Sequence, residues 1–158
     1  SQPALLRQAA AAYLPILGGL EFDRLAALPY AALPIGTAIS LMGNWPLVYP
    51  RKEVKEYGTR AEIEGDFQPG ERVVIIDDLA TTGGSKFDAL ERLAAAGLQA
   101  QDVVVLIDRQ SGAKKALADR GFRLHAVATL GDLLDYWEAA EKVPVELILQ
   151  AREFLRSS

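Results

Sequence analysis

Asp77 and Asp78 stand side by side between an apolar run and a short segment rich in threonine, glycine and serine. Carboxylates accept hydrogen bonds from sugar hydroxyls, whereas hydroxyl side chains and the backbone N–H groups of a glycine-bearing turn donate to phosphate oxygens. The N-terminus of a following helix favours an anion at the same place. The pattern therefore predicts a site for a phosphorylated sugar. Its predicted residues are Asp77, Asp78, Leu79, Ala80, Thr81, Thr82, Gly83, Gly84 and Ser85.

Two better-known phosphate-binding loops do not match this segment. The sequence lacks the G-x-x-x-x-G-K-[ST] spacing of a P-loop and the G-x-G-x-x-G spacing of a dinucleotide-binding loop. A strand cap followed by a plain turn would account for any one of these residues alone. It does not account for the whole run from Val73 to Ser85, which favours a binding site.

Continuous apolar runs predict the strands that must position these residues. The predicted strands are Asp23–Pro29, Pro46–Arg51, Arg72–Asp77, Asp102–Asp108 and Arg123–Thr129, and helical patterns lie before, between and after them. Such an alternation is typical of a parallel sheet covered on both faces, so the predicted fold class is α/β. Ligands of these sheets bind beyond the carboxyl ends of the strands, where Asp77 and Asp78 are predicted to lie. Residues 51–65 are predicted to form a polar excursion and no core element.

Length and composition set outer limits on the function. The chain has 158 residues, a length that predicts one globular domain over residues 1–158. Its net charge is −4, so no overall positive field would attract nucleic acid. It contains no cysteine, so disulfides and thiolate metal sites are excluded, and a reducing compartment, the cytoplasm, is expected. No apolar run approaches the roughly 20 residues of a membrane-spanning helix, so no membrane partner is expected.

The run from Val73 to Ser85 resembles the phosphoribosyl pyrophosphate (PRPP) signature of type I phosphoribosyltransferases. "LPYAALPIGTAIS", "YPRKEVKEYGTRAEIEG" and "LIDRQSGAK" resemble segments of orotate phosphoribosyltransferase, in the form found as a domain of bifunctional UMP synthases. The resemblance covers nearly the whole chain. It implies a mainly parallel five-stranded sheet flanked by helices, a homodimer, and Mg²⁺ that is carried by PRPP and not by direct protein ligands. The implied reaction joins PRPP and orotate to give orotidine 5′-monophosphate and pyrophosphate.

Basic residues gather after the second predicted strand, together with a tyrosine. They are Arg51, Lys52, Lys55 and Tyr57. Cations delivered by a loop would stabilise a pyrophosphate leaving group. Glu53 and Glu56 balance the local charge and leave a solvated surface loop as the alternative. The resemblance implies a mobile catalytic loop whose basic residues and tyrosine bind PRPP, with Lys55 reaching the active site of the partner subunit. The implied catalytic residues are Lys52, Lys55, Asp77 and Asp78.

Orotate carries a carboxylate, and Arg109 follows a predicted strand. A guanidinium can bind a carboxylate through two parallel hydrogen bonds, and the resemblance implies that Arg109 and Thr81 bind orotate. The turn Pro29–Pro34 is implied to contact pyrophosphate through its backbone, although Ala31 stands where many bacterial relatives carry lysine. His125, the only histidine, is predicted to be structural.

Two questions stay open at the level of sequence. Enzymes of the resembled family have an N-terminal hood over the base, and the chain begins at Ser1 after that segment, so we expect weak base recognition. A fused orotidine monophosphate decarboxylase domain would fit the resemblance to UMP synthases. The alternatives to an orotate enzyme are a phosphoribosyltransferase for a purine or uracil and a non-catalytic PRPP-binding regulator. Arg109 and the basic segment favour the orotate enzyme.

Overall fold

The structure, a computed structural model, describes residues 2–52, 62–82 and 84–157. Its helices are α1 (Pro3–Leu17), α2 (Ala32–Gly43), α3 (Gly84–Ala95), α4 (Ala113–Ala118), α5 (Leu130–Ala139) and α6 (Val145–Ser157). Its strands are β1 (Arg24–Ala27), β2 (Leu47–Pro50), β3 (Ile63–Glu64), β4 (Arg72–Ala80), β5 (Gln99–Asp108) and β6 (Arg123–Thr129). Within the described ranges, no helix combines the length and the apolar character that crossing a membrane requires.

The strands form a six-stranded sheet in the order β3-β2-β1-β4-β5-β6. Neighbouring strands are parallel except β2 and β3, where Tyr49 lies opposite Glu64 and Pro50 lies opposite Ile63 in an antiparallel pair. The α/β class is confirmed. The prediction of five strands is wrong by one, because β3 lies within the segment predicted as a polar excursion. Ile63 is buried in the core, which gives this short strand its apolar contact.

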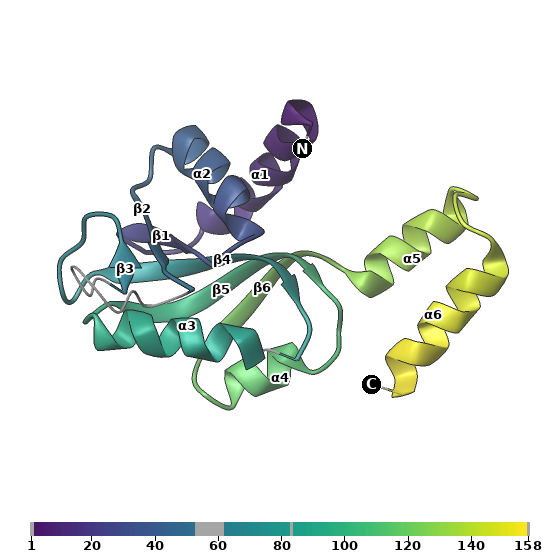
Figure 1. The fold of residues 1–158 in the computed structure, drawn as a ribbon. Coiled ribbons are helices and arrows are strands. Elements are labelled where there is room, and N and C mark those ends of the chain that lie inside the picture. The colour runs from purple at the N-terminus through teal and green to yellow at the C-terminus, as the bar shows by residue number, and fades with distance from the viewer. Residues whose placement is uncertain (1, 53–61, 83, 158) are drawn as a thin grey trace.

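Helices cover both faces of the sheet (Figure 1). Alternate residues of β4 explain this arrangement, because Val73 and Ile75 pack on the side of α3 and α4, whereas Val74 and Ile76 pack on the side of α1 and α2. Successive side chains of a strand point to opposite faces, so a continuous run of branched apolar residues fills two cores at once. The central strand therefore holds the residues that follow it in a rigid frame.

The turn after β1 is shorter than predicted. The backbone N–H of Leu33 donates to the carbonyl oxygen of Tyr30 at 3.2 Å, and α2 begins at Ala32. The turn predicted over Pro29–Pro34 therefore ends before Ala32, because its second half forms the first turn of the helix. The peptide bond between Pro29 and Tyr30 is cis.

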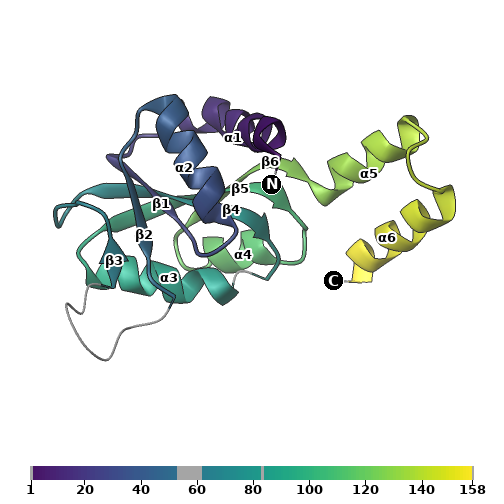
Figure 2. The same cartoon turned by 45° about the horizontal axis from the view of Figure 1, so that its top comes forward.

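Helices α5 and α6 form a hairpin that projects away from the sheet (Figure 2). Thr129 and Asp132 cap the start of α5 reciprocally, which fixes its direction directly after β6. Arg152 of α6 donates to Asp135 and Glu138 of α5 at 2.7 and 2.6 Å and joins the two helices. The exposed large apolar side chains of this hairpin include Tyr136, Val145, Leu147 and Leu149.

Candidate functional site

Strand β4 continues beyond the end of its neighbour β1, and Asp77 and Asp78 (the acid pair) lie where the two strands part. Ala27, the last residue of β1, pairs with Ile76. Asp77 and the residues up to Ala80 continue to pair with β5. The prediction that β4 ends at Asp77 is therefore wrong, because β5 extends beside it and keeps three more residues in the sheet. The acid pair occupies a step in the carboxyl edge of the sheet, beyond β1.

Asp77 points to the α3 side of this step, where it meets Lys86. The ammonium of Lys86 donates to Oδ2 of Asp77 at 2.7 Å, and the backbone N–H of Asp78 donates to Oδ1 at 2.9 Å. Burial raises the pKa of Asp77 above its ordinary value, although the charge of Lys86 acts in the opposite direction. The Asp77 carboxylate is thus fixed in orientation, and burial makes its negative charge unfavourable.

Asp78 adds a second carboxylate at the same step. Its side chain is half-buried, and Oδ1 accepts from the backbone N–H of Leu79 at 2.9 Å. The Asp78 carboxyl group is one of the lesser causes that raise the pKa of Asp77. Two adjacent carboxylates favour a ligand that offers several hydroxyl donors.

Two side chains that the sequence pattern did not reveal hold the acid pair in place. Lys86 donates to the carbonyl oxygen of Leu79 at 2.6 Å, in addition to its bond with Asp77. Tyr13 of α1 is fully buried, and its hydroxyl donates to the carbonyl oxygen of Asp77 at 2.8 Å. Burial, followed by the charges of the acid pair, raises the pKa of Tyr13, so the phenol stays protonated. Lys86 directly follows the predicted run and could have been noticed, whereas Tyr13 lies 64 residues from Asp77 in sequence and gave no signal.

The turn between β4 and α3 begins at Thr81, later than the sequence predicts, because Leu79 and Ala80 are the last residues of β4. Thr81 is half-buried and Thr82 is exposed. Gly84 opens α3, and a Cβ atom added there would meet nothing within 4 Å, so space is open beside the helix start. The first N–H groups of a helix have no acceptor within it, and they offer donors to an anion at this point. Gly83 and the side chain of Ser85 lie outside the described part of the chain.

Arg109 and Thr81 lie at the same edge of the sheet. The ends of β4 and β5 pair through Ala80 and Asp108, and the backbone N–H of Arg109 donates to the carbonyl oxygen of Ala80 at 2.9 Å. The Arg109 side chain is exposed. An exposed guanidinium beside the turn can receive a carboxylate ligand through paired hydrogen bonds.

A cavity of about 410 Å³ opens beside Asp77. It is lined by Leu28, Pro29, Pro50, Arg51, Lys52, Asp77, Asp88, Ala89 and Arg92. The cavity therefore lies between the turn after β1, the end of β2 and one side of α3. Its size suits a small-molecule ligand, and its wall combines cations with carboxylates.

The predicted pyrophosphate-binding cations differ in their surroundings. Arg51 forms an ion pair with Glu64 of β3, so a carboxylate already balances its charge, a pairing that the sequence pattern did not indicate. Lys52 is exposed, and its Nζ lies 5.0 Å from the centroid of the Tyr30 ring, in a cation–π contact. Of these two cations, Lys52 is thus the one that a ligand can recruit more readily. The predicted residues Lys55 and Tyr57 lie outside the described residues.

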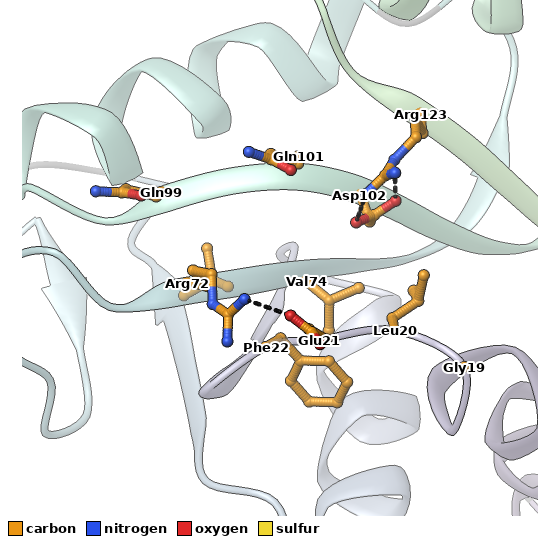
Figure 3. A pocket seen from close by; sticks show the side chains of 11 residues that line it. Gly19, Leu20, Glu21, Phe22, Arg72, Val74, Gln99, Gln101, Asp102 and Arg123 are labelled. Atoms are coloured by element: carbon orange, nitrogen blue, oxygen red, sulfur yellow. Dashed lines mark hydrogen bonds and ion pairs between the residues drawn. The ribbon is translucent and has the colours of Figure 1, made fainter.

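A second cavity, of about 290 Å³, lies at the amino ends of β4, β5 and β6, at the far end of the sheet from the acid pair. Figure 3 shows the side chains that line it. Asp102 of β5 accepts hydrogen bonds from Arg123 at 2.8 and 2.7 Å, and His125 Nε2 lies 2.7 Å from the same carboxylate. Arg72 donates to Glu21 at 2.9 Å. The charged side chains here pair with one another, and His125 is placed as a structural partner of Asp102.

The described carboxylates of the site do not gather into a metal-binding group. In the ranges that the structure describes, no group of three or more histidine, cysteine, aspartate or glutamate side chains is placed to hold a metal ion. Asp77 already binds the ammonium of Lys86. A divalent cation here would need phosphate or water oxygens for most of its coordination.

The chain is similar to known proteins both in sequence and in structure. It is 41% identical over 149 residues to the bifunctional enzyme PyrF/PyrE of Nostoc sp., which is 94% of this chain and 31% of that protein. It is 41% identical over 134 residues to orotate phosphoribosyltransferase of Natronomonas pharaonis, which is 85% of this chain and 76% of that protein. The solved structure of Leishmania donovani UMP synthase superposes with a TM-score of 0.92 and 44% identity over 99% of this chain and 34% of that one.

These relatives differ in length. The chain spans about a third of the Nostoc protein and of uridine 5′-monophosphate synthase of Bos taurus, which it also matches, and 76% of the archaeal orotate phosphoribosyltransferase. No protein-family model matches the sequence. The archaeal similarity covers more than two thirds of both proteins, and the superposition with UMP synthase covers nearly every residue of this chain. The chain belongs to the orotate phosphoribosyltransferase family.

Proposed function

We propose that the chain is a pentosyltransferase that transfers the phosphoribosyl group of PRPP to orotate, giving orotidine 5′-monophosphate and pyrophosphate in UMP biosynthesis. The observation that carries this proposal is the step beyond β1, where the acid pair, the turn into α3 and Arg109 meet at one edge of the sheet. Membership of the family supports the same pair of substrates.

The chemistry of PRPP matches the groups in the site. Asp77 and Asp78 accept hydrogen bonds from the ribose hydroxyls, while the turn Thr81–Ser85 and the start of α3 bind the 5′-phosphate. Asp77 also lines the 410 Å³ cavity, which receives the pyrophosphate beside Arg51 and Lys52. Lys55 and Tyr57 complete this set of pyrophosphate-binding residues in the proposal.

The proposed reaction is a direct displacement at C1 of the ribose. An orotate nitrogen forms the new bond as the bond from C1 to the pyrophosphate oxygen breaks, with inversion and no covalent enzyme intermediate. Positive charge grows on the ribose and negative charge on the leaving group. The acid pair stabilises the first, and Lys52 and Lys55 stabilise the second. Arg109 and Thr81 hold orotate in position for the attack.

Mg²⁺ is the proposed cofactor, and we propose that PRPP carries it into the site. When bound, the ion neutralises charge on the pyrophosphate oxygens. The pyrophosphate oxygens of PRPP are hard ligands of the kind that Mg²⁺ prefers, which supports a cation that arrives on its substrate.

The proposed assembly is a homodimer in which Lys55 serves the partner subunit's site. The α5–α6 hairpin exposes several large apolar side chains, and these support an interface there, because a second protein could bury them. A fused orotidine monophosphate decarboxylase domain is proposed from the length of the bifunctional relatives. A cytoplasmic location is proposed from the lack of cysteine.

An absorbance assay of orotate consumption with PRPP and Mg²⁺ tests the proposed function. We expect PRPP-dependent loss of orotate with release of an equal amount of pyrophosphate. Uracil and adenine are offered as competing bases, and turnover of either in place of orotate would contradict the assignment of the base. Calorimetric binding of magnesium PRPP without turnover of any base would indicate a regulator and contradict the enzyme.

A further inference from the structure

Lys86 is buried beside the acid pair, where an ammonium group is costly unless its charge is compensated. Its side chain is 3% exposed. Nζ donates to Oδ2 of Asp77 at 2.7 Å and to the carbonyl oxygen of Leu79 at 2.6 Å. The two acceptors lie on either side of Asp78, so one ammonium bridges the strand segment that carries both acids.

Asp77 depends on this cation. Its side chain is 14% exposed, and burial raises its pKa while Lys86 lowers it. Tyr13 donates to the main chain of Asp77 and leaves the carboxylate to Lys86. The other charged residues that adjoin Asp77 or line its cavity are Asp78, Arg51, Lys52, Asp88 and Arg92. In the described part of the chain, Lys86 is the cation that is bonded to the Asp77 carboxylate.

We propose that Lys86 is a positioning residue for the ribose: it fixes the Asp77 carboxylate in the orientation and charge state that accept a ribose hydroxyl. This inference rests on the proposed function, because it assigns a task to Lys86 within the same site. Lys86 acts through Asp77 and does not contact the substrate.

The physical reason is that Asp77 must be ionised to do its work. A protonated carboxyl group offers little negative potential where positive charge grows on the ribose. Without Lys86, burial and the neighbouring Asp78 would favour the protonated form up to a higher pH. Loss of Lys86 should therefore lower turnover, and most strongly at acidic pH.

The test measures kcat/KM for PRPP between about pH 5 and pH 9 in the full chain. For Lys86→Met we expect kcat/KM to be about 30-fold lower at pH 7. We also expect the acidic limb of its pH profile to lie about one pH unit higher than in the wild type. Lys86→Arg, which keeps the cation, should stay within about threefold of the wild type. Lys115→Met is the matched control and should match the wild type, since Lys115 is exposed on α4, is paired with Asp119 and does not line the cavity beside Asp77.

Several results would overturn the proposal. One is a folded Lys86→Met variant with wild-type kcat/KM, and another is a loss of activity with an unmoved acidic limb, which would mean a merely structural role. If Lys86→Met does not fold, the double variant Asp77→Asn/Lys86→Met decides. If the double variant folds, the result supports the pairing of Lys86 with Asp77. If neither the single nor the double variant folds, the result contradicts that pairing.

Failure of the proposed function can be told apart from failure of this inference. The carboxyl carbon of Asp77 can be titrated by NMR in isotope-labelled protein without substrate. We expect its apparent pKa to be higher in Lys86→Met than in the wild type, whatever the protein catalyses. If the wild type turns over no orotate but this shift is seen, only the proposed function fails. An unshifted Asp77 overturns the role of Lys86.

Discussion

The two ends of the sheet each bury an aspartate beside cations, but they use it differently. At the carboxyl end, Asp77 is paired with buried Lys86, and burial raises its pKa. At the amino end, burial acts on Asp102 in the same direction, but hydrogen bonds from Arg123 and His125 outweigh it and leave the pKa below its ordinary value. The fold thus fully compensates the buried charge of Asp102, whereas it compensates the buried charge of Asp77 only in part.

This difference separates a structural ion cluster from a binding site. The Asp102 carboxylate receives three close contacts from side chains that link β5 to β6. Asp77 stands at an edge that β1 leaves uncovered, lines a cavity and adjoins a second carboxylate. Groups in a cleft whose pKa is perturbed by burial and by a specific charged partner are candidates for functional sites. We therefore expect the chemistry at the carboxyl end.

The largest effect is expected from removal of the acid pair. The Asp77→Asn/Asp78→Asn variant should lose more than about 1,000-fold in kcat/KM, because neutral amides cannot stabilise charge on the ribose, while circular dichroism shows a retained fold. Asp102→Asn is the matched control at the other end of the sheet and should keep turnover within about twofold. Near-normal activity of the double variant would refute the ribose-binding role.

The next effect concerns the basic segment beside the cavity. Lys55→Ala should lower kcat by about 100-fold and change the dissociation constant of magnesium PRPP by less than about threefold, because its charge acts on the departing pyrophosphate. Stopped-flow turnover and calorimetry measure the two quantities. Mixing this variant with the acid-pair variant should restore part of the activity if Lys55 serves the partner subunit's site. No recovery in the mixture would count against that arrangement.

A smaller effect, on the KM for orotate, should distinguish Arg109 at the carboxyl end of the sheet from Arg123 at the amino end. Arg109→Ala should raise the KM for orotate by about 20-fold and leave the KM for PRPP nearly unchanged, since a bidentate contact to the orotate carboxylate is lost. Arg123→Ala at the amino end should leave the KM for orotate unchanged. Equal effects of the two substitutions would contradict the assignment of Arg109.

The smallest effect is a difference in how stability depends on pH. The folded pKa of Asp102 is lowered, so its contribution is present above its unfolded pKa of about 3.9 and is lost as pH falls through the folded pKa. The folded pKa of Asp77 is raised, so the wild type gains stability as pH falls through that pKa toward about 3.9. Urea unfolding at a series of pH values should therefore show opposite slopes when Asp102→Asn and Asp77→Asn are each compared with the wild type. Slopes of the same sign would show that the two ends do not differ in this way.

Most of the fold follows from the apolar pattern. Val73 to Ile76 fill two cores, and such a run has few other stable places than a central parallel strand. The exceptions come from pairing. Strand β3 consists of Ile63 and Glu64, too short for any periodic signal, and it exists because it pairs with the end of β2. The extension of β4 past Asp77 depends in the same way on β5.

The sequence predicts the residues that carry charge in the site better than the residues that hold them. Thr81 and Arg109 directly follow β4 and β5, Asp77 lies near the end of β4, and parallel strands bring such residues to one edge. Lys86 looks like an ordinary lysine in the first turn of a helix, and only the packing of α3 on β4 shows that it is buried. The bond from Tyr13 joins segments that no local pattern relates.

A crystal of the protein soaked with magnesium PRPP tests the central claim most directly. We predict the ribose hydroxyls within hydrogen-bonding distance of the Asp77 and Asp78 carboxylates, the 5′-phosphate at the start of α3, and no ligand in the cavity beside Asp102. Density for PRPP at the amino end of the sheet, or an unoccupied carboxyl edge at saturating ligand, would contradict the proposed site.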